Sequence, residues 1–522
     1  MIQWDKDDLD ALGLLKVDVL ALGMLSAIHR ALDLIGCRMQ DIPPEDPLVY
    51  DMLCAADTVG VFQIESRAQM AMLPRLRPRH FYDLVIEVAL VRPGPIQGDM
   101  VHPYLRRRHG KEAIEAMRPE IAAVLGRTCG VPIFQEQVMQ LAVVAAGFTP
   151  GEADQLRRAM AAWRRKGGLE PFEQKLIAGM RQRGHDESFA QRICAQIRGF
   201  GEYGFPESHA ASFALLVYVS AWIKRHHPAA FLCALLNSQP MGFYSPSQLV
   251  QDARRHGVEV RPAMATHSGW EAQLENPAPG TSTDRPAVRL GLSSISGLSQ
   301  AAVFRLLEAR RQRPFASVAD LATRARLAHR DLDLLAAAGT LANLAGHRRQ
   351  AAWAVAGIAV QLDLLSSVEP PETAAEATQL AEPSEAENLI ADYASTGLTL
   401  GRHPLSLLRA RLTAQRFVSA SQLLNAADRQ LMRAAGIVTC RQRPGTASGI
   451  VFVTLEDETG LANIVVHARL VEQQRRELLG ARLLGVLGQV QREGTVVHLV
   501  AKRLVDLSAL LGSLPTASRN FH

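Results

Sequence analysis

The chain has 522 residues, 48% of them hydrophobic and 21% charged, which is enough for about three or four folded domains. Its six cysteines are scattered without a C-x-x-C pair, which argues against a disulfide framework and against structural zinc. The first residues are acidic rather than signal-like, and the longest apolar run, 211–223, is too short to cross a bilayer. We therefore expect a cytoplasmic protein with no membrane partner, and the net charge of +5 mildly favours polyanionic partners.

The first predicted element is a short strand at 15–19, within LKVDVLALGM. Aliphatic residues alternate there with Lys16 and Asp18, so these two side chains project from the same face. The pattern alone favours a salt bridge between them at a sheet edge, and the alternative is that Asp18 binds a metal. A helix is expected over 20–36, with one apolar face made by Leu22, Leu25, Ile28 and Leu32.

A long, mostly helical region is predicted from about 50 to 235, and its first motif is VRPGP. Arg92 precedes Pro93-Gly94-Pro95, a rigid turn that ends the apolar run before it. The charge run at 106–111 follows, and such a run is typical of a solvated helix face.

An arginine-rich helix, ADQLRRAMAAWRRK, is predicted next, over 153–166. Arg157 and Arg164 are seven residues apart, and so are Arg158 and Arg165, so each pair lies on one side of the helix, with Lys166 at its end. Guanidinium groups in that arrangement suit a run of phosphates. The alternative is a solvated face whose arginines pair with the acidic residues Glu152 and Asp154.

The motif FGEYGFPESHAASFALL places a helix start at Pro206. Ser208 and His209 then fall in the first turn, where free amides and the positive end of the helix dipole favour an anion. The motif by itself favours the simpler alternative, in which Ser208 caps the helix and His209 is a core histidine.

The segment VRLGLSSISGLSQAAVFRLLEAR predicts two helices joined at Gly297, Leu298 and Ser299. This resembles a helix-hairpin-helix, whose turn amides bind a DNA phosphate without reading the base sequence. A serine stands where the second glycine of such a turn is usual, and a plain αα-hairpin is the alternative.

The last third begins with an acidic stretch and ends in β structure. Between Arg349 and Arg402 there is no Lys or Arg but there are eight Asp and Glu residues, which is typical of a solvated linker. From 436 to 504, five short β-branched segments, with a helix between the third and the fourth, predict a small OB-type barrel. Such barrels bind oligonucleotides, sugars or proteins. Arg441, Arg443 and Lys502 give this one some positive charge.

The motifs appear in a characteristic order: LGLLKVDVLALGML, GVFQIES, ALVRPGP, FQEQVMQLA, EADQLRRAM, FGEYGFPESHA and WIKRHHPAAF, followed by the barrel. In this order they resemble a bacterial C-family (DnaE-type) DNA polymerase III α subunit, and most closely its error-prone translesion branch, ImuC. The family's upstream P-D-x-D-x-D strand and PHP domain are missing from this sequence, so the resemblance is to the C-terminal half only.

The resemblance implies a multidomain, mainly α fold with a remnant of an α/β palm at the N-terminus and an OB-fold β-barrel at the C-terminus. The domains expected from it are the C-terminal part of the palm (1–50), fingers (51–240), a helix-hairpin-helix DNA-binding region (241–360), an acidic connector (361–430), the OB-fold (431–510) and a tail (511–522).

The resemblance also implies the roles of individual residues. Asp18 matches the third catalytic carboxylate of a two-metal Mg²⁺ site, which is incomplete in this chain because the other two lie upstream in the family. Nucleotide or phosphate binding is expected from Lys16, Arg92, Arg157, Arg158, Ser208 and His209. DNA binding is expected from Arg164, Arg165, Lys166, Gly297, Leu298 and Ser299.

The function implied by the resemblance is error-prone, DNA-directed DNA synthesis in repair and translesion synthesis. Its substrates would be primer–template DNA and dNTPs, with accessory translesion proteins, and through them the sliding clamp, as partners. We expect little or no synthesis by this chain alone. The alternative is a non-catalytic DNA-binding or scaffold protein in a mutasome-like complex.

Overall fold

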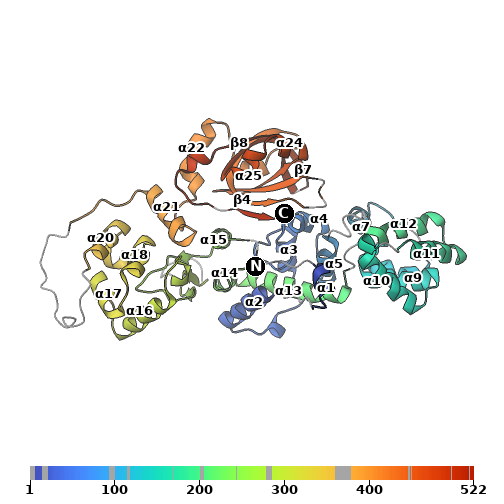
Figure 1. Cartoon of the computed structure of the whole chain (residues 1–522), viewed down its shortest axis with the longest axis horizontal. Helices are drawn as coiled ribbons and strands as arrows, with labels where there is room; N and C mark the ends of the chain where they lie inside the picture. Colours follow the sequence, from blue (N-terminus) through green and yellow to red (C-terminus); the bar gives the residue numbers. More distant parts are fainter. Residues whose placement is uncertain are drawn as a thin grey trace.

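The chain forms a central helical body with helical parts on both sides of it and a β-barrel packed above it, as Figure 1 shows. This computed structural model describes residues 6–14, 21–92, 100–114, 118–166, 169–199, 205–242, 244–277, 285–358, 378–444, 447, 449–494, 496–516 and 518–521.

The first half of the chain is helical, as the sequence predicted. Its elements are α1 (Lys6–Ala11), α2 (Leu22–Ile35), η1 (Met39–Asp41), α3 (Pro47–Cys54), α4 (Arg67–Leu76), α5 (Phe81–Leu90), α7 (Val101–Arg108), α8 (Pro119–Leu125), η2 (Gly126–Thr128), α9 (Gln135–Ala146), α10 (Pro150–Lys166), α11 (Glu170–Gln182), α12 (Glu187–Gly199), α13 (Glu207–His226), α14 (Pro228–Asn237) and α15 (Pro246–Arg255).

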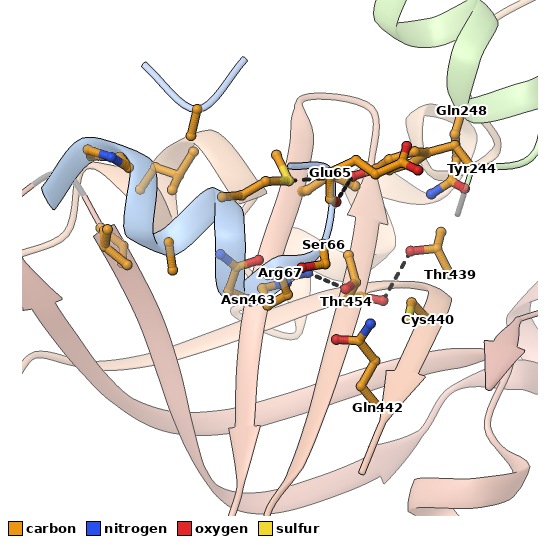
Figure 2. A pocket seen from close by; sticks show the side chains of 18 of the residues that line it. Glu65, Ser66, Arg67, Tyr244, Gln248, Thr439, Cys440, Gln442, Thr454 and Asn463 are labelled. Atoms are coloured by element: carbon orange, nitrogen blue, oxygen red, sulfur yellow. Dashed lines mark hydrogen bonds between the residues drawn. The ribbon is translucent and has the colours of Figure 1, made fainter. Parts of the chain in front are cut away.

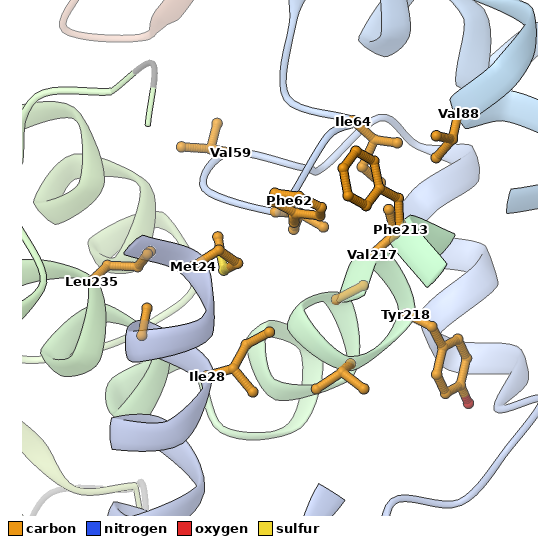
Figure 3. Close-up of a cluster of buried hydrophobic side chains, with 14 of the residues drawn as sticks. Met24, Ile28, Val59, Phe62, Ile64, Val88, Phe213, Val217, Tyr218 and Leu235 are labelled. Atoms are coloured by element: carbon orange, nitrogen blue, oxygen red, sulfur yellow. The ribbon is translucent and has the colours of Figure 1, made fainter. Parts of the chain in front are cut away.

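Helix α13 lies at the centre of this body and contacts α2, α3, α5 and α14. It is apolar on most of its circumference, which is the pattern of a helix surrounded by protein. Phe213, Val217 and Tyr218 are buried, and the side chains around them in Figure 3 come from α2, α5, α14 and the loop before α4. None of the described helices is long and apolar enough to span a membrane.

The face that α2 buries differs from the predicted one. Ile28 and Leu32 are buried as expected, but Leu22 is 58% exposed and Leu25 is 43% exposed. The buried stripe is instead completed by Met24, Ala27 and Ala31. The alanines allow α14 to approach closely, and a stripe chosen by side-chain size alone overlooks them.

A small mixed sheet and a helical hairpin region follow the body, and three more helices lead to the barrel. These elements are β1 (Val260–Arg261), β2 (Gln273–Glu275), β3 (Ala287–Arg289), η3 (Leu292–Ser294), α16 (Gln300–Gln312), α17 (Val318–Ala325), α18 (His329–Ala337), α19 (Ala342–Ala345), α20 (Arg348–Ala356), α21 (Glu385–Thr396), α22 (Pro404–Ala414) and α23 (Ala420–Leu424). The described part of the acidic connector, 378–430, forms ion pairs with the hairpin region and with the barrel. Arg348 of α20 pairs with Asp392 of α21, and Arg409 of α22 pairs with Asp457 at the barrel rim.

The C-terminal part is a closed five-stranded barrel, which confirms the predicted barrel. Strands pair in the order β4–β5–β6–β8–β7 and back to β4, with β6 and β8 parallel. Two short helices lie between the third and fourth strands, where the sequence predicted one helix. The elements are β4 (Leu431–Gln442), β5 (Val451–Asp457), β6 (Gly460–Val466), α24 (Ala468–Gln473), α25 (Arg475–Gly480), β7 (Leu483–Glu493), β8 (Val496–Asp506), η5 (Ser508–Leu511) and β9 (Arg519–Phe521), which pairs with the end of β4.

Two glycines allow the barrel to close. A Cβ on Gly436, where β4 passes from β7 to β5, would lie 2.7 Å from the Cβ of Leu455. A Cβ on Gly488 would lie 2.3 Å from the carbonyl oxygen of Val500, at the bulge in the β7–β8 pairing. Only residues without a side chain fit these close approaches between strands.

We predict that Gly488→Ala destabilises the barrel by at least about 2 kcal/mol, because the new methyl group meets backbone that cannot rotate away. Hydrogen exchange of the barrel strands, followed by mass spectrometry, would measure this as lost protection. Gly480→Ala is the matched control, since nothing lies within 4 Å of a Cβ at that position. Equal protection in both variants would contradict the close approach.

Candidate functional site

Some predicted site residues lie outside the described part of the chain. Lys16 and Asp18 fall within residues 15–20, so the structure does not place the predicted metal ligand. Arg164, Arg165 and Lys166 belong to the last turn of α10, but their side chains are likewise outside the description.

Arg92 is held against the body at the end of α5. Its Nε donates to the Val88 carbonyl at 3.1 Å, and its Nη2 donates to Oε1 of Gln63 at 3.2 Å. The guanidinium carbon lies 4.6 Å from the centre of the Phe205 ring, a cation–π contact. Arg92 is half-buried, so its position is set by these contacts while part of it still faces solvent.

Phe205 connects Arg92 to His209 in an aromatic stack. The His209 ring lies 5.1 Å from Phe205 and 4.2 Å from Phe213, centre to centre. His209 and Ser208 are both exposed, so His209 is not the core histidine that the simpler alternative required. Nor does Ser208 cap the helix, because the N-cap of α13 is Pro206. The structure therefore places both Arg92 and His209 against the Phe205 ring, with the exposed Ser208 next to His209 in the first turn of α13.

The first turn of α13 already binds an anion from the chain itself. The amide of Glu207 donates to Oε2 of Glu136 at 3.0 Å, which places a carboxylate at the positive end of the dipole. The Glu207 carboxylate in turn accepts from the Tyr82 hydroxyl at 2.9 Å and from Arg127 at 2.8 Å. Burial, followed by the hydrogen bond to Glu207, raises the pKa of Tyr82. The predicted anion site thus has one of its amides occupied.

Arg157 and Arg158 both bind Asp154, one turn earlier on α10. Arg157 donates through Nε and Nη2 at 3.0 and 2.8 Å, and Arg158 lies 2.8 Å from the second carboxylate oxygen. The hydrogen bond from Arg157 lowers the pKa of Asp154. The sequence offered the alternative that these arginines pair with Glu152 and Asp154, and the structure shows the pairing with Asp154. Glu152 pairs instead with Lys175, and its pKa is lowered to about 2 by that contact and by the Thr149 amide.

The charge run in α7 is not the solvated face that the sequence predicted. Arg108 is only 19% exposed and lies 2.5 Å from the fully buried Asp83. Arg107 is 10% exposed and pairs with Glu112, as does the more exposed Arg106. Arg107 and Arg108 are turned inward, whereas Arg106, His109 and Lys111 stay exposed. Arg108 donates to the Leu76 and Arg77 carbonyls at the end of α4, a contact that the pattern of a single sequence does not reveal.

The predicted hairpin turn is present before α16, but the arm that precedes it is the short 3-10 turn η3 rather than an α-helix. Gly297 has φ +79°, a conformation that favours glycine, and Leu298 is buried beneath the turn. The Ser299 side chain caps α16 by accepting from the Ala302 amide. Arg330 lies beside the turn, 3.7 Å from where a Gly297 Cβ would be, and makes no ion pair with any described residue.

A buried lysine is a central polar residue that our sequence reasoning missed. Lys224 in α13 is 2% exposed, and its Nζ lies 3.0 Å from Asp57, 2.8 Å from Asp252 and 3.0 Å from the Val59 carbonyl. His256 adds a 2.5 Å contact to Asp57. The signal in the sequence was a lysine at the end of an otherwise apolar helical segment. Its carboxylate partners could not be identified from this, because they are far from Lys224 in the sequence.

The ligand atoms of Asp57, Asp252 and His256 lie within 4.8 Å of one another, a spacing that could hold a metal ion. The Lys224 ammonium already supplies positive charge to both carboxylates. Burial raises the pKa of Asp57, but the hydrogen bond from His256 and the charge of Lys224 outweigh it and bring the pKa to about 2. The same hydrogen bond raises the pKa of His256. Asp57 and His256 are therefore both mainly charged at pH values between the lowered pKa of Asp57 and the raised pKa of His256.

A cavity of about 320 Å³ separates α4 from the barrel (Figure 2). Arg67 crosses it and donates to the Thr454 hydroxyl of β5. Asn463 of β6 and Gln442 of β4 line the opposite wall. This wall is the strand face that OB-folds use for oligonucleotides, and here it faces the helical body.

Comparisons with known proteins agree along the whole chain. Residues 24–184 match the family described as the finger domain of the bacterial DNA polymerase III alpha subunit, and residues 257–351 match a helix-hairpin-helix motif. The chain is 68% identical over 529 residues to an error-prone DNA polymerase of Dechloromonas aromatica, covering 100% of this chain and 50% of that protein.

Two further relatives with the same name give the same result. Identity is 67% over 533 residues to the protein of Azoarcus sp. and 62% over 533 residues to that of Bordetella bronchiseptica, again covering 100% of this chain and 50% of each relative. The chain therefore spans about half the length of the curated relatives it matches. The predicted resemblance to part of an error-prone C-family polymerase is confirmed.

We predict that Lys224→Met destabilises the helical body by about 3–5 kcal/mol, because Asp57 and Asp252 lose the ammonium that balances them. Urea unfolding followed by the fluorescence of the neighbouring Trp222 would measure it. Lys175→Met is the matched control, since Lys175 is half-exposed in its pair with Glu152 and its loss should cost no more than about 1 kcal/mol. Similar losses in both variants would contradict a buried role for Lys224.

Proposed function

We propose that this chain, which is similar along its whole length to half of several error-prone DNA polymerases, is the C-terminal part of such a polymerase. Its work would be to bind primer–template DNA and the incoming nucleotide. The observation that carries this proposal is the identity of 68% that extends over 100% of the chain. The match to a polymerase finger domain over residues 24–184 supports it.

The catalytic metals would be held largely by residues outside this chain. Within the described residues, the acidic cluster at Asp57 already contains the Lys224 ammonium, so it does not fit a divalent cation. Asp18 would be the catalytic carboxylate that this chain contributes, and it would share two Mg²⁺ ions with carboxylates from the other half of the polymerase. When bound, Mg²⁺ would activate the primer hydroxyl and neutralise the triphosphate.

Nucleotide binding would involve the exposed surface made by Arg92, Ser208 and His209. A guanidinium and an imidazole held side by side by the Phe205 ring suit a phosphate group close to a base. Lys16 would lie near the metal-bound phosphates. Arg157 and Arg158 would clamp the triphosphate by exchanging Asp154 for the stronger negative charge.

Duplex DNA would lie against the hairpin at Gly297, Leu298 and Ser299, with Arg330 beside the turn as a phosphate contact. Arg164, Arg165 and Lys166 would add contacts from the end of α10. The barrel would lie near the single-stranded template. These contacts go to the DNA backbone, so binding would be independent of base sequence.

The biological setting that we propose is DNA repair and translesion synthesis in the cytoplasm. The name shared by the relatives, error-prone DNA polymerase, supports this setting. Accessory translesion proteins, and through them the sliding clamp, would be the partners.

We predict that the purified chain binds primer–template DNA with an affinity that falls linearly with salt on a log–log plot, by about 0.9 per phosphate contact. Arg330→Ala should reduce that slope by roughly one contact. Arg313→Ala is the control, because Arg313 is exposed but already paired with Asp320. Fluorescence anisotropy at several salt concentrations would measure the affinity of each variant. An affinity that does not change with salt concentration would contradict the proposal.

Primer extension with Mg²⁺ and all four dNTPs tests the catalytic part of the proposal. We expect no extension by the chain alone and unchanged primer–template binding in Asp18→Ala, since one carboxylate cannot hold two metals. Extension that Asp18→Ala abolishes would show that this chain supplies the other ligands itself. Extension restored by adding the other half of the polymerase, and lost again with Asp18→Ala, would exclude the non-catalytic scaffold.

A further inference from the structure

A small pocket of about 160 Å³ lies on the barrel between the end of β4 and helix α25. It is separate from the cavity that faces α4, although Gln442 lines both. Neither the nucleotide surface near His209 nor the hairpin at Gly297 contributes to it, so the proposed polymerase function does not use it.

Three guanidinium groups line this pocket, from Arg441, Arg443 and Arg475. Arg441 is 6% exposed and donates from Nε to the Leu478 carbonyl at 2.7 Å and from Nη2 to the Ala481 carbonyl at 2.5 Å. Its Nη1 donates to Oγ of Ser518 at 2.5 Å and to Oδ1 of Asn520 at 3.4 Å. These acceptors are neutral, and burial lowers the pKa of Arg441.

The other two arginines are exposed at the rim. Neither Arg443 nor Arg475 pairs with a carboxylate within the described ranges, and the described lining includes no Asp or Glu. This contrasts with Arg107 and Arg108 of α7 and with Arg157 and Arg158 of α10, which have internal carboxylate partners. The positive charge of the pocket lining is therefore left unbalanced among the described residues, and it is complementary to an anionic partner.

Four aliphatic side chains also line the pocket, Val451, Val471, Leu478 and Leu479, together with the polar Gln442 and Asn520. Leu479 is 53% exposed, so it presents apolar surface at the rim of the pocket. A cavity of about 150 Å³ accommodates a benzene molecule, so this one has room for one large apolar side chain.

We propose that this pocket docks an acidic peptide segment of a partner protein, which inserts one large apolar side chain against Leu479 and places its carboxylates on Arg443 and Arg475 at the rim, with the charge of the buried Arg441 behind them. A nucleic-acid strand fits less well. The described lining offers no aromatic ring for a base to stack on, and a phosphate does not fill an aliphatic floor. An acidic segment with an apolar anchor uses both features together.

The test is fluorescence anisotropy of the full chain with a labelled short peptide of Asp and Glu that carries one central Phe. Arg475→Glu should weaken binding at least about tenfold, because attraction at the rim becomes repulsion. Leu479→Ser, at an exposed position that should not disturb folding, should weaken it by several fold. Replacing the peptide's Phe by Ser should have a similar effect.

Lys502→Glu is the matched control, since it makes the same charge change at an exposed position of β8 outside the pocket lining. It should leave binding within about twofold of the unaltered chain, and an equal loss would show general electrostatic attraction and overturn the proposal. The proposal would also be overturned if replacing the peptide's Phe left its affinity unchanged, or if the peptide did not bind the unaltered chain. If a single-stranded oligothymidine binds the chain, loses affinity in Arg475→Glu and is not displaced by the peptide, the pocket would be a nucleic-acid site instead.

Discussion

The helical body depends on the salt-bridge network at the buried Lys224. Its ammonium joins α13 to Asp57, Asp252 and the Val59 carbonyl, so the central helix, the loop before α4 and helix α15 are held in one arrangement. An ion pair in a protein interior contributes little net stability compared with apolar packing, but it is strict about geometry. This network therefore fixes the end of α13 against segments that are far from it in the sequence.

The arginines of this chain fall into two groups by the charge that surrounds them. Those of α7 and the described ones of α10 have internal carboxylates, with Arg108 on Asp83 and Arg157 on Asp154, so their fields largely cancel within the fold. Arg330 at the hairpin turn, and Arg443 and Arg475 on the barrel, have no such partner among the described residues. Attraction of a polyanion depends on this second group, because a neutralised arginine must first give up its own carboxylate. The positions of the unpaired arginines therefore indicate where a polyanion would bind better than the net charge of +5 does.

The barrel meets the body through polar contacts around a cavity rather than through a continuous apolar core. Arg67 reaches Thr454, Arg75 pairs with Glu493, and Arg519 donates to the Gly242 carbonyl. The buried apolar residues of the barrel belong to clusters distinct from that of the body. Within the barrel, closure depends on Gly436 and Gly488, where strands approach too closely for any side chain. The barrel thus has its own hydrophobic core and contacts the body through the polar side chains of a few arginines.

Local patterns were enough to predict the helical first half, the five-stranded barrel with helical structure between its third and fourth strands, and the turn at Gly297. Each of these follows from the spacing of apolar residues and from glycine along a short stretch of chain. The same patterns misjudged the face of α2, the exposure of α7 and the burial of His209, since these depend on which other helix lies opposite. The Lys224 network and the arginine pocket join residues far apart in sequence, and no local spacing records such a meeting. The local sequence therefore specifies the helices, strands and turns. Burial and charge balance arise only when distant elements pack together, because this packing determines which polar groups remain hydrated and which must pair within the protein.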